Sequence, residues 1–533
     1  MQAPLFSILL PTYNPDLGWL REALDSVIDQ TCTDWELCIA DDKSTDSGVR
    51  ETLERYSRMD PRVRCIFRED NGHISEASNS ALELSSGTWI VLMDHDDLLS
   101  PDALDLLTEA IKQYPKARLI YSDEDKIRPD GRRHAPYYKC DWNRDLFYSH
   151  NMISHLGVYH AQTLKVVGGF RTGLEGSQDY DLALRFLEKV GDQAILHIPE
   201  VLYHWREHSG STSSGHEAKS YVMEAGLRAL NDHYERTGVA AHARDGGMGS
   251  YRTVHELPAN ASVEFFVTWQ GAERKLLERI SEIESECAGV TWSMTLFPPD
   301  GWVKRRRMQE FSDHPHIKIW KEDEETPMAA RMNQAAENSR AGYLHFLPDT
   351  LKPLGSGWLR ELVSQAARPE IGAVGTMVLY PDGRVRQAGL LLDPVSIIRR
   401  AFHHYHGDSP GYMGRLRLVQ NFSAVGIDGM MVARDKFLQA GGFDETALKS
   451  RYHDVDLCLR IKNMGLRNLW TPHARFVERK PIPRIREWMG TLIPKARSDR
   501  EVMRSRWGGR LLTDPCYGQN LDQRRKDFHC PSR

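Results

Sequence analysis

The chain has 533 residues, of which 41% are hydrophobic and 27% charged, with a net charge of −5 at pH 7. One hydrophobic core rarely serves a chain of this length, so we expect a globular protein with two or more domains. The small net charge argues against nucleic acid as the main partner, and no apolar run approaches the roughly 20 residues that span a membrane.

The cysteines and the first residues favour a cytoplasmic location. The eight cysteines form neither a C-x-x-C pair nor a zinc-like spacing, so we expect reduced packing residues. No signal peptide follows Met1. We therefore expect a cytoplasmic protein, with peripheral contact at the inner face of the membrane as an open alternative.

Short apolar runs alternate with helical patterns along the first part of the chain. We expect strands at 6–10, 35–40, 63–67 and 89–93, and helices at 17–28 and 77–84. This alternation predicts a mostly parallel sheet covered by helices. In such sheets, ligands bind at the carboxyl ends of the strands.

Polar residues follow three of these strands, at 11–14, 41–46 and 94–97. Asp, Ser, Thr and Asn are ordinary turn residues, so each segment alone is weak evidence. The run Asp94-His95-Asp96-Asp97 is different, because a helix cap needs only one carboxylate. Several acidic groups at the end of one strand favour a metal site.

An internal repeat divides the chain. Gly168-Gly169-Phe170 recurs as Gly441-Gly442-Phe443, and residues 178–185 recur as 453–460, in the same order and at nearly the same offset. Chance does not readily give both, so we expect two related domains. Glycine, proline and asparagine place the join within 243–261.

With Tyr203-His204-Trp205-Arg206 added, these motifs resemble the family 2 inverting glycosyltransferases of the GT-A fold. More narrowly, they resemble the two-module enzymes of bacterial O-antigen and rhamnan assembly. The resemblance implies an α/β protein with two tandem GT-A domains, each Rossmann-like with a mostly parallel sheet, plus a helical C-terminal tail. It divides the chain into a catalytic domain at 1–250, a degenerate and non-catalytic domain at 251–480 and the tail at 481–533.

Transfer of a sugar from a nucleotide diphosphate leaves a charged diphosphate, which a divalent metal stabilises as a Lewis acid. Oxygen ligands suit Mg²⁺ or Mn²⁺. The resemblance implies that Asp94 belongs to the nucleotide-sugar site and that Asp96 binds the metal. It implies that His204 is a metal ligand or contacts the diphosphate, and that Arg206 faces the phosphates.

Inversion at the anomeric carbon needs one base to take the proton of the acceptor hydroxyl. The resemblance gives this role to Asp179, with Asp181 holding the local geometry; the alternative is that both only cap a helix. Asp42 would accept the N3–H of a pyrimidine. The nucleoside would therefore contact Pro11, Thr12, Tyr13, Asp41 and Asp42.

The second module departs from the family pattern. Leu347-Pro348-Asp349-Thr350 offers a single carboxylate where more are expected, and Glu478 stands in place of the family's histidine. One aspartate rarely holds Mg²⁺ together with a diphosphate. We therefore expect no sugar transfer here, although Asp454 leaves a metal-independent second active site open.

The tail carries an apolar stripe at helical spacing, formed by Ile485, Trp488, Met489 and Leu492. It predicts either a helix packed on its own domain or contact with an anionic membrane where lipid-linked acceptors reside.

These features together predict a metal-dependent hexosyltransferase. It would move a sugar, such as rhamnose or another deoxyhexose, from a nucleotide diphosphate to a cell-surface polysaccharide, O-antigen or lipid-linked acceptor. A two-site glycan polymerase and a glycan-binding scaffold are the alternatives. A nucleotidyltransferase would need a glycine-rich basic loop, which residues 11–16 lack.

Overall fold

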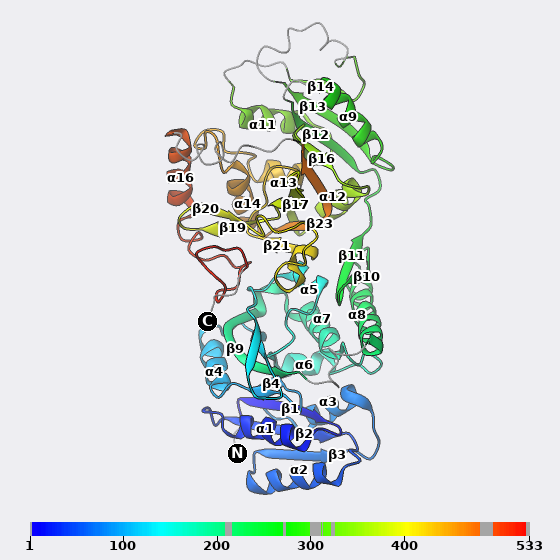
Figure 1. The fold of residues 1–533 in the computed structure, drawn as a ribbon, viewed down its shortest axis with the longest axis vertical. Coiled ribbons are helices and arrows are strands. Elements are labelled where there is room, and N and C mark those ends of the chain that lie inside the picture. The colour runs from blue at the N-terminus through cyan, green and yellow to red at the C-terminus, as the bar shows by residue number, and fades with distance from the viewer. Residues whose placement is uncertain are drawn as a thin grey trace. The chain divides into compact units, whose positions relative to one another are not determined.

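The computed structural model describes residues 3–207, 216–269, 273–298, 311, 313–320, 326–479 and 494–528. The chain divides into two compact units, drawn in Figure 1 from blue to red along the sequence. Unit 1 comprises residues 1–253 with 518–520, and unit 2 comprises residues 254–517 with 521–533.

Unit 1 alternates strands and helices. Its elements are β1 (Phe6–Thr12), α1 (Leu17–Ile28), β2 (Trp35–Asp41), α2 (Ser47–Met59), β3 (Val63–Phe67), α3 (His73–Leu84), β4 (Trp89–Leu92), β5 (Leu98–Leu99), α4 (Ala103–Gln113), β6 (Leu119–Ile127), β7 (Arg133–Tyr137), α5 (Arg144–Ser149), β8 (Gly157–His160), α6 (Ala161–Val167), α7 (Gln178–Val190), η1 (Asp192–Ala194), β9 (Ile195–Arg206) and α8 (His216–Thr237). A hairpin of β10 (Ala241–Gly247) and β11 (Ser250–His255) follows.

The sheet of unit 1 has the strand order β3-β2-β1-β4-β8-β6-β9-β5, with β7 paired to β6. Strands β3, β2, β1 and β4 are parallel neighbours, as the alternating pattern predicts. Beyond them the sheet is mixed, since β8 runs antiparallel to both β4 and β6, while β9 is parallel to β6. The expected early helices and strands are all present, with α3 beginning at His73 rather than at residue 77.

Helix α1 shows why these elements form and pack. Asp16 caps it, because its Oδ1 accepts hydrogen bonds from the backbone N–H groups of Gly18 at 2.8 Å and Trp19 at 3.1 Å. One face of the helix is apolar and buried against the sheet. The shared core includes Phe6, Ile8, Leu10, Leu20, Leu24 and Val27.

Unit 2 repeats the alternation. Its elements are β12 (Ser262–Thr268), α9 (Glu273–Glu284), β13 (Thr291–Phe297), β14 (Ile317–Ile319), α11 (Met328–Asn338), β15 (Tyr343–Phe346), β16 (Leu351–Pro353), α12 (Trp358–Ala366), β17 (Ile371–Leu379), β18 (Val385–Gln387), β19 (Leu390–Asp393), β20 (Ile397–Arg400), η2 (Tyr412–Arg417), β21 (Gln420–Phe422), β22 (Met431–Ala433), α13 (Arg434–Gln439), α14 (His453–Asn463), β23 (Arg467–Glu478) and α16 (Pro494–Trp507).

The strand order confirms the internal repeat. The unit 2 sheet runs β14-β13-β12-β15-β22-β17-β23-β16, with β18 paired to β17. Position by position, this order matches that of unit 1. Side-chain contacts repeat as well, since Asn79 bonds the backbone of Phe170 in unit 1 and Asn333 bonds that of Phe443 in unit 2. The chain is therefore two copies of one α/β arrangement.

Each unit also has a late helix tied by an ion pair to the loop that follows its Gly-Gly-Phe segment. In unit 1, Arg171 of the loop binds Asp232 of α8 at 2.8 Å. In unit 2 the signs are reversed, because Asp444 of the loop binds Arg506 of α16 at 2.7 Å. Helices α8 and α16 are thus each tied to the Gly-Gly-Phe loop of their own unit, although α8 packs on α7 whereas α16 contacts β20.

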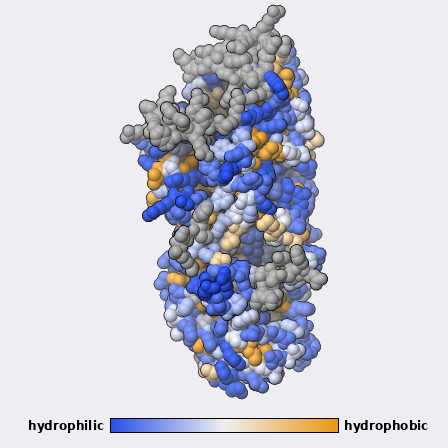
Figure 2. Space-filling view, in the orientation of Figure 1, coloured by the Kyte–Doolittle hydropathy of each residue, from blue (hydrophilic) through white to orange (hydrophobic). Residues whose placement is uncertain are grey.

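The predicted apolar stripe of the tail lies outside the described residues. Within the described part, no helix is long and apolar enough to cross a membrane. On the face shown in Figure 2, hydrophilic residues predominate and hydrophobic residues form scattered patches. Every cysteine among the described residues is a free thiol, in keeping with the expected packing role.

The contact between α7 and α8 gives unit 1 a pH-dependent stability. Glu188 accepts hydrogen bonds from His233 and Arg236. Burial alone would raise the pKa of Glu188, but these bonds hold it at about 2, against an ordinary value of 4.5. The lowered pKa stabilises the fold fully above pH 4.5, and this stabilisation is lost as the pH falls towards 2.

We expect Glu188→Gln to lower the free energy of unfolding at pH 7 by about 2 to 3 kcal/mol, from a shift of this size. In urea titrations from pH 7 to pH 3, the difference from the wild type should shrink below about pH 4.5. Glu235→Gln, at an exposed position of α8, is the control and should have little effect. A difference independent of pH would contradict the assignment.

Candidate active site

The three polar strand ends predicted from the sequence lie together in unit 1. The backbone N–H of Asn14, after β1, donates to Ser44 Oγ, after β2, at 2.9 Å. His95, after β4, places Nδ1 3.3 Å from the carbonyl oxygen of Pro11. This meeting follows from the parallel order of β2, β1 and β4, whose carboxyl ends share one edge of the sheet.

Two aspartates lie where the sequence predicts the nucleoside end of the site. Asp42 is buried, and its Oδ1 accepts from Arg68 Nε at 2.8 Å and from the N–H of Gly72 at 3.0 Å. Asp41 accepts from the N–H of Ser44 through Oδ2, while its buried Oδ1 has no partner among the described residues. An oxygen of this kind can receive a donor from a ligand.

Thr12 and Tyr13 differ in exposure. Thr12 is buried at the end of β1, and its carbonyl oxygen accepts from the N–H of Asp42. Tyr13 is 47% exposed, so its ring is available to a ligand. Both lie at the end of β1, next to the end of β2 that carries Asp42.

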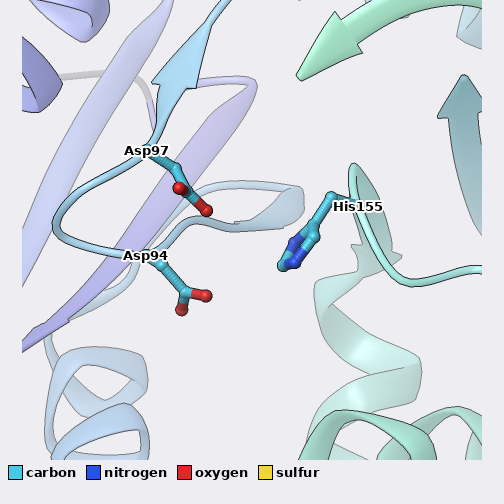
Figure 3. Close-up of side chains that lie close together, drawn as sticks. All are labelled: Asp94, Asp97 and His155. Atoms are coloured by element: carbon cyan, nitrogen blue, oxygen red, sulfur yellow. The ribbon is translucent and has the colours of Figure 1, made fainter. Parts of the chain in front are cut away.

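The acidic cluster gathers around a histidine that the sequence did not single out. One ligand atom from each of Asp94, Asp97 and His155 lies within 4.8 Å of the others, a spacing that can hold a metal ion. Figure 3 shows the three side chains pointing toward one another, from the loop after β4 and the loop before β8. Two carboxylates and an imidazole are a donor set that suits a divalent cation such as Mn²⁺.

Tyr203 of β9 organises this cluster. Its hydroxyl donates to Asp97 Oδ2 at 2.7 Å and accepts from the N–H of Asp94 at 3.1 Å. The ring of His155 stacks on the Tyr203 ring with centroids 4.4 Å apart. Asp97 Oδ1 also accepts from the N–H of Arg206 at 2.7 Å. The acids and the imidazole are therefore held in place by the sheet itself.

A buried lysine fixes the loop that carries His155. Lys139 Nζ binds Glu124 Oε2 at 3.0 Å and donates to the carbonyl oxygens of Ile153 and His155. Glu124 Oε2 in turn accepts from the N–H of His155 at 3.0 Å. All three protons of the ammonium group have acceptors, so Lys139 fixes the position of this loop.

Burial and mutual repulsion disfavour the charged forms of the carboxylates in this region. Burial raises the pKa of Asp94, opposed by the His155 imidazole. Burial and the neighbouring charges of Asp94 and Asp96 raise the pKa of Asp97 well above its usual range. No lysine or arginine of the described residues forms an ion pair with the side chain of Asp94, Asp97 or Asp179. A bound cation would relieve this repulsion.

Asp179 lies at the start of α7, across from the cluster. Its Oδ2 accepts from Asn151 Nδ2 at 2.7 Å. Burial raises the pKa of Asp179, and the charge of His155 opposes the rise. Asp181, two residues on, is fully buried and is held by Arg171 and by Arg185 at 2.8 Å, so it anchors the helix that presents Asp179.

The structure places the remaining predicted residues beside this cluster. His204 Nδ1 is 2.6 Å from Asp125 Oδ1, the arrangement by which proteins orient a metal-binding imidazole through its second nitrogen. Arg206 is 2% exposed, binds Glu22 at 2.6 Å and donates to the carbonyl oxygen of Asp96 at 2.7 Å. Arg206 thus supports the acidic loop, and its contact with phosphates stays a prediction.

Sequence reasoning missed His155 and Asn151, and gave Asp97 no separate role. Asp97 was part of the acidic run, and its burial and two donors distinguish it only in the structure. His155 and Asn151 lie in an irregular segment before β8, where no periodicity or motif marks them. Only the pairing of β8 with β4 brings this segment to the acidic cluster.

The family model described as "Glycosyl transferase family 2" matches residues 7–168. A PGL/p-HBAD biosynthesis glycosyltransferase of Mycobacterium bovis is 35% identical over 189 residues, which are 35% of this chain and 70% of that protein. The chain belongs to glycosyltransferase family 2.

Other relatives cover more of the chain. The O-antigen biosynthesis protein RfbC of Myxococcus xanthus is 30% identical over 493 residues, 90% of this chain but 38% of that protein. The chain spans 58% and 38% of the lengths of the first two curated relatives that it matches. A crystal structure of S. aureus TarS 1–349 with UDP-GlcNAc aligns over 43% of this chain and 72% of that one, with 19% identity and a TM-score of 0.34.

Proposed function

We propose that unit 1 is an inverting, metal-dependent glycosyltransferase that takes a sugar from a nucleotide diphosphate donor. The observation that carries the proposal is the convergence of Asp94, Asp97 and His155 at the carboxyl end of β4, close to Asp179, where no lysine or arginine of the described residues pairs with the Asp94 or Asp97 side chain. Family 2 membership supports the reaction class. The catalytic domain is proposed to be residues 1–250.

In this proposal, Asp179 is the base. A hydroxyl oxygen of the acceptor forms a bond to the anomeric carbon as the bond from that carbon to the diphosphate oxygen breaks. The proton of the hydroxyl moves to the Asp179 carboxylate, and the electron pair of the broken bond leaves with the diphosphate. A pKa raised by burial suits Asp179 to accept this proton. Asn151 orients the carboxylate.

The cation is proposed to be Mg²⁺ or Mn²⁺, and it would supply positive charge to the departing diphosphate. Two sets of residues can hold it. Asp94, Asp97 and His155 already converge. Asp96 and His204 are the set that the family resemblance implies, and the Asp125 bond of His204 supports it. Each set takes its aspartates from the loop between β4 and β5.

The nucleoside is proposed to lie at the ends of β1 and β2. The exposed ring of Tyr13 supports this placement, as does the buried Asp41 Oδ1, which has no hydrogen-bond partner in the described part of the chain. Asp42 is proposed to accept the base N3–H through Oδ2, which has only a 3.2 Å contact with the N–H of Gly72. Pro11, Thr12, Asp94 and Arg206 complete the proposed nucleotide-sugar site.

The acceptor is proposed to be a growing bacterial cell-surface polysaccharide or its lipid-linked precursor, and the donor a deoxyhexose such as rhamnose. The name of the Myxococcus relative supports this class. Residues 251–480 are proposed to be a degenerate domain that transfers no sugar and instead packs against the first domain or holds the acceptor chain. Residues 481–533 are proposed to be its tail, with peripheral contact at the inner membrane face.

A two-site polymerase is the second candidate. It is favoured by Asp454, which occupies the first turn of α14 as Asp179 occupies that of α7. The surroundings of Asp454 disfavour it, because the neighbouring Asp428 is already paired with Arg386. A glycan-binding scaffold from outside the enzymes would bind saccharides without consuming any nucleotide sugar.

A donor panel tests the proposal. The chain is incubated with UDP-, GDP- and dTDP-sugars and an oligosaccharide acceptor, with and without a chelator. We expect transfer that the chelator abolishes and Mn²⁺ or Mg²⁺ restores. Asp96→Ala should reduce it by roughly 100-fold or more, since Lewis-acid stabilisation contributes several kcal/mol. Asp130→Ala, in the exposed turn between β6 and β7, is the control.

Transfer that withstands chelation and Asp96→Ala alike would show that the acidic loop holds no essential metal. Binding of saccharides without turnover of any donor would favour the scaffold.

A further inference from the structure

The strand registers identify which residues of unit 2 occupy the positions of the unit 1 site. His160 of β8 pairs with Trp89, the first residue of β4, and Ala433 of β22 pairs with Tyr343, the first residue of β15. His155 lies five residues before His160, and Asp428 lies five residues before Ala433. Asp428 therefore stands where unit 1 has His155.

The same comparison places Glu478. The short strand β5 pairs its first residue, Leu98, with His204 of β9. Its counterpart β16 pairs its first residue, Leu351, with Glu478 of β23. Glu478 therefore stands where unit 1 has His204. Both histidine positions of unit 1 are thus carboxylates in unit 2.

These two carboxylates share one edge of a guanidinium group. Arg386 of β18 places Nη2 2.5 Å from Asp428 Oδ2 and Nε 3.6 Å from Glu478 Oε2. Nε and Nη2 form the same side of the planar guanidinium, so one arginine can lie beside two acidic groups; only the Asp428 contact is short enough for a hydrogen bond, and Glu478 is an ion-pair neighbour. The Arg386 side chain is 10% exposed and that of Glu478 is 3% exposed, so the cation is enclosed.

A second arginine contacts the loop at 347–350, which carries a single aspartate. Arg279 of α9 is completely buried and donates to the carbonyl oxygens of Leu351 and Pro348, on either side of Asp349. Burial lowers the pKa of Arg279 to about 10, and the charges of Glu282, its ion-pair partner at 3.1 Å, and of Asp349 oppose the fall. Asp428 and Glu478 thus pair with one arginine of unit 2, and Asp349 has the charge of a second arginine nearby.

Unit 1 has the opposite arrangement. Its carboxylates at 94, 97 and 179 have no lysine or arginine partner among the described residues. A buried carboxylate needs an opposite charge close by. In unit 1 the His155 imidazole supplies part of that charge and a bound cation would add to it, whereas in unit 2 Arg386 supplies it.

We propose that Arg386 is a resident cation that replaces a divalent metal in unit 2, and that its removal uncovers a latent metal site formed by Asp428 and Glu478. The comparison with unit 1 rests on the proposed function, but the site itself rests on unit 2 alone. Two carboxylates at one guanidinium edge can close on a single divalent ion once the side chain is apolar. Unit 2 is in this sense a metal-independent copy.

The test uses Mn²⁺ alone as the probe and counts bound ions per chain by electron paramagnetic resonance. The wild type should bind one ion through unit 1 and lose it in the double variant Asp94→Ala, Asp96→Ala, which removes a ligand from each candidate set. Arg386→Met should bind one ion more than its parent in either background, and adding Asp428→Asn should remove the extra ion. Arg384→Met, at a side chain 58% exposed just before Arg386, should add none.

Each result is decisive. An unchanged count in folded Arg386→Met overturns the latent site, whatever unit 1 does. A wild type that binds no Mn²⁺ overturns the metal part of the proposed function and leaves the Arg386 comparison valid. If Arg386→Met does not fold, Asp428→Asn and Glu478→Gln are added, because neutral partners no longer need the cation. Recovery of folding supports the proposal, and failure to recover overturns it.

Discussion

Asp179→Asn lowers the kcat of sugar transfer by about 10²- to 10⁴-fold, the range that a positioned base contributes. The amide cannot take the proton of the acceptor hydroxyl, yet it has nearly the shape of the carboxylate and can keep a contact with Asn151. The KM for the donor should therefore change little. Initial rates with the best donor of the panel, at saturating acceptor, measure both constants.

Asp454→Asn is the matched control, because it makes the same change at the first turn of the equivalent helix in unit 2. We expect it to leave the rate unaltered. Near wild-type transfer by Asp179→Asn would remove that residue as the base. A shortened product from Asp454→Asn would establish the two-site polymerase instead.

His155→Ala should weaken Mn²⁺ binding by roughly 10-fold or more and slow transfer in proportion at limiting Mn²⁺, if the ion lies between Asp94, Asp97 and His155. The stacking of His155 on Tyr203 places the imidazole on the Tyr203 side of β9. His204 is the next residue along the strand and so faces the other side. The two candidate ligand sets can therefore be separated.

Calorimetric titration of Mn²⁺ into His155→Ala and His204→Ala makes the comparison, with His160→Ala as control because His160 bonds Thr163 away from the acids. Weaker binding in His155→Ala alone identifies the converging cluster as the site. Loss confined to His204→Ala would place the ion with Asp96 and His204, and the cluster in Figure 3 would then be structural.

The sequence was sufficient for the first four strands of unit 1 and their order of appearance. Residues 6–10 and 35–40 are apolar runs between clear helical patterns, so local periodicity is enough. The mixed half of the sheet depends on long-range pairing: β5 has two residues, and β8 runs antiparallel between β4 and β6. No local pattern specifies those pairings.

The site divides along the same line. The acidic run was visible because its members are consecutive, and Asp179 because its segment resembles a family motif. His155 joins them only through the register of β8, and the bond between Arg206 and Glu22 connects distant parts of the chain. In unit 2 the loss of metal ligands was visible, but the arginine beside Asp428 comes from another strand and was not.

The ion pairs that tie α8 to unit 1 and α16 to unit 2 have reversed signs, and this reversal affects how a duplicated chain folds correctly. Two copies with one strand order can exchange equivalent helices while they assemble. If α16 packed on unit 1, Arg506 would meet Arg171, and if α8 packed on unit 2, Asp232 would meet Asp444. Each misassembled pairing brings like charges together, whereas each native pairing joins opposite ones. The charge reversal therefore disfavours the exchange of these two helices between the copies.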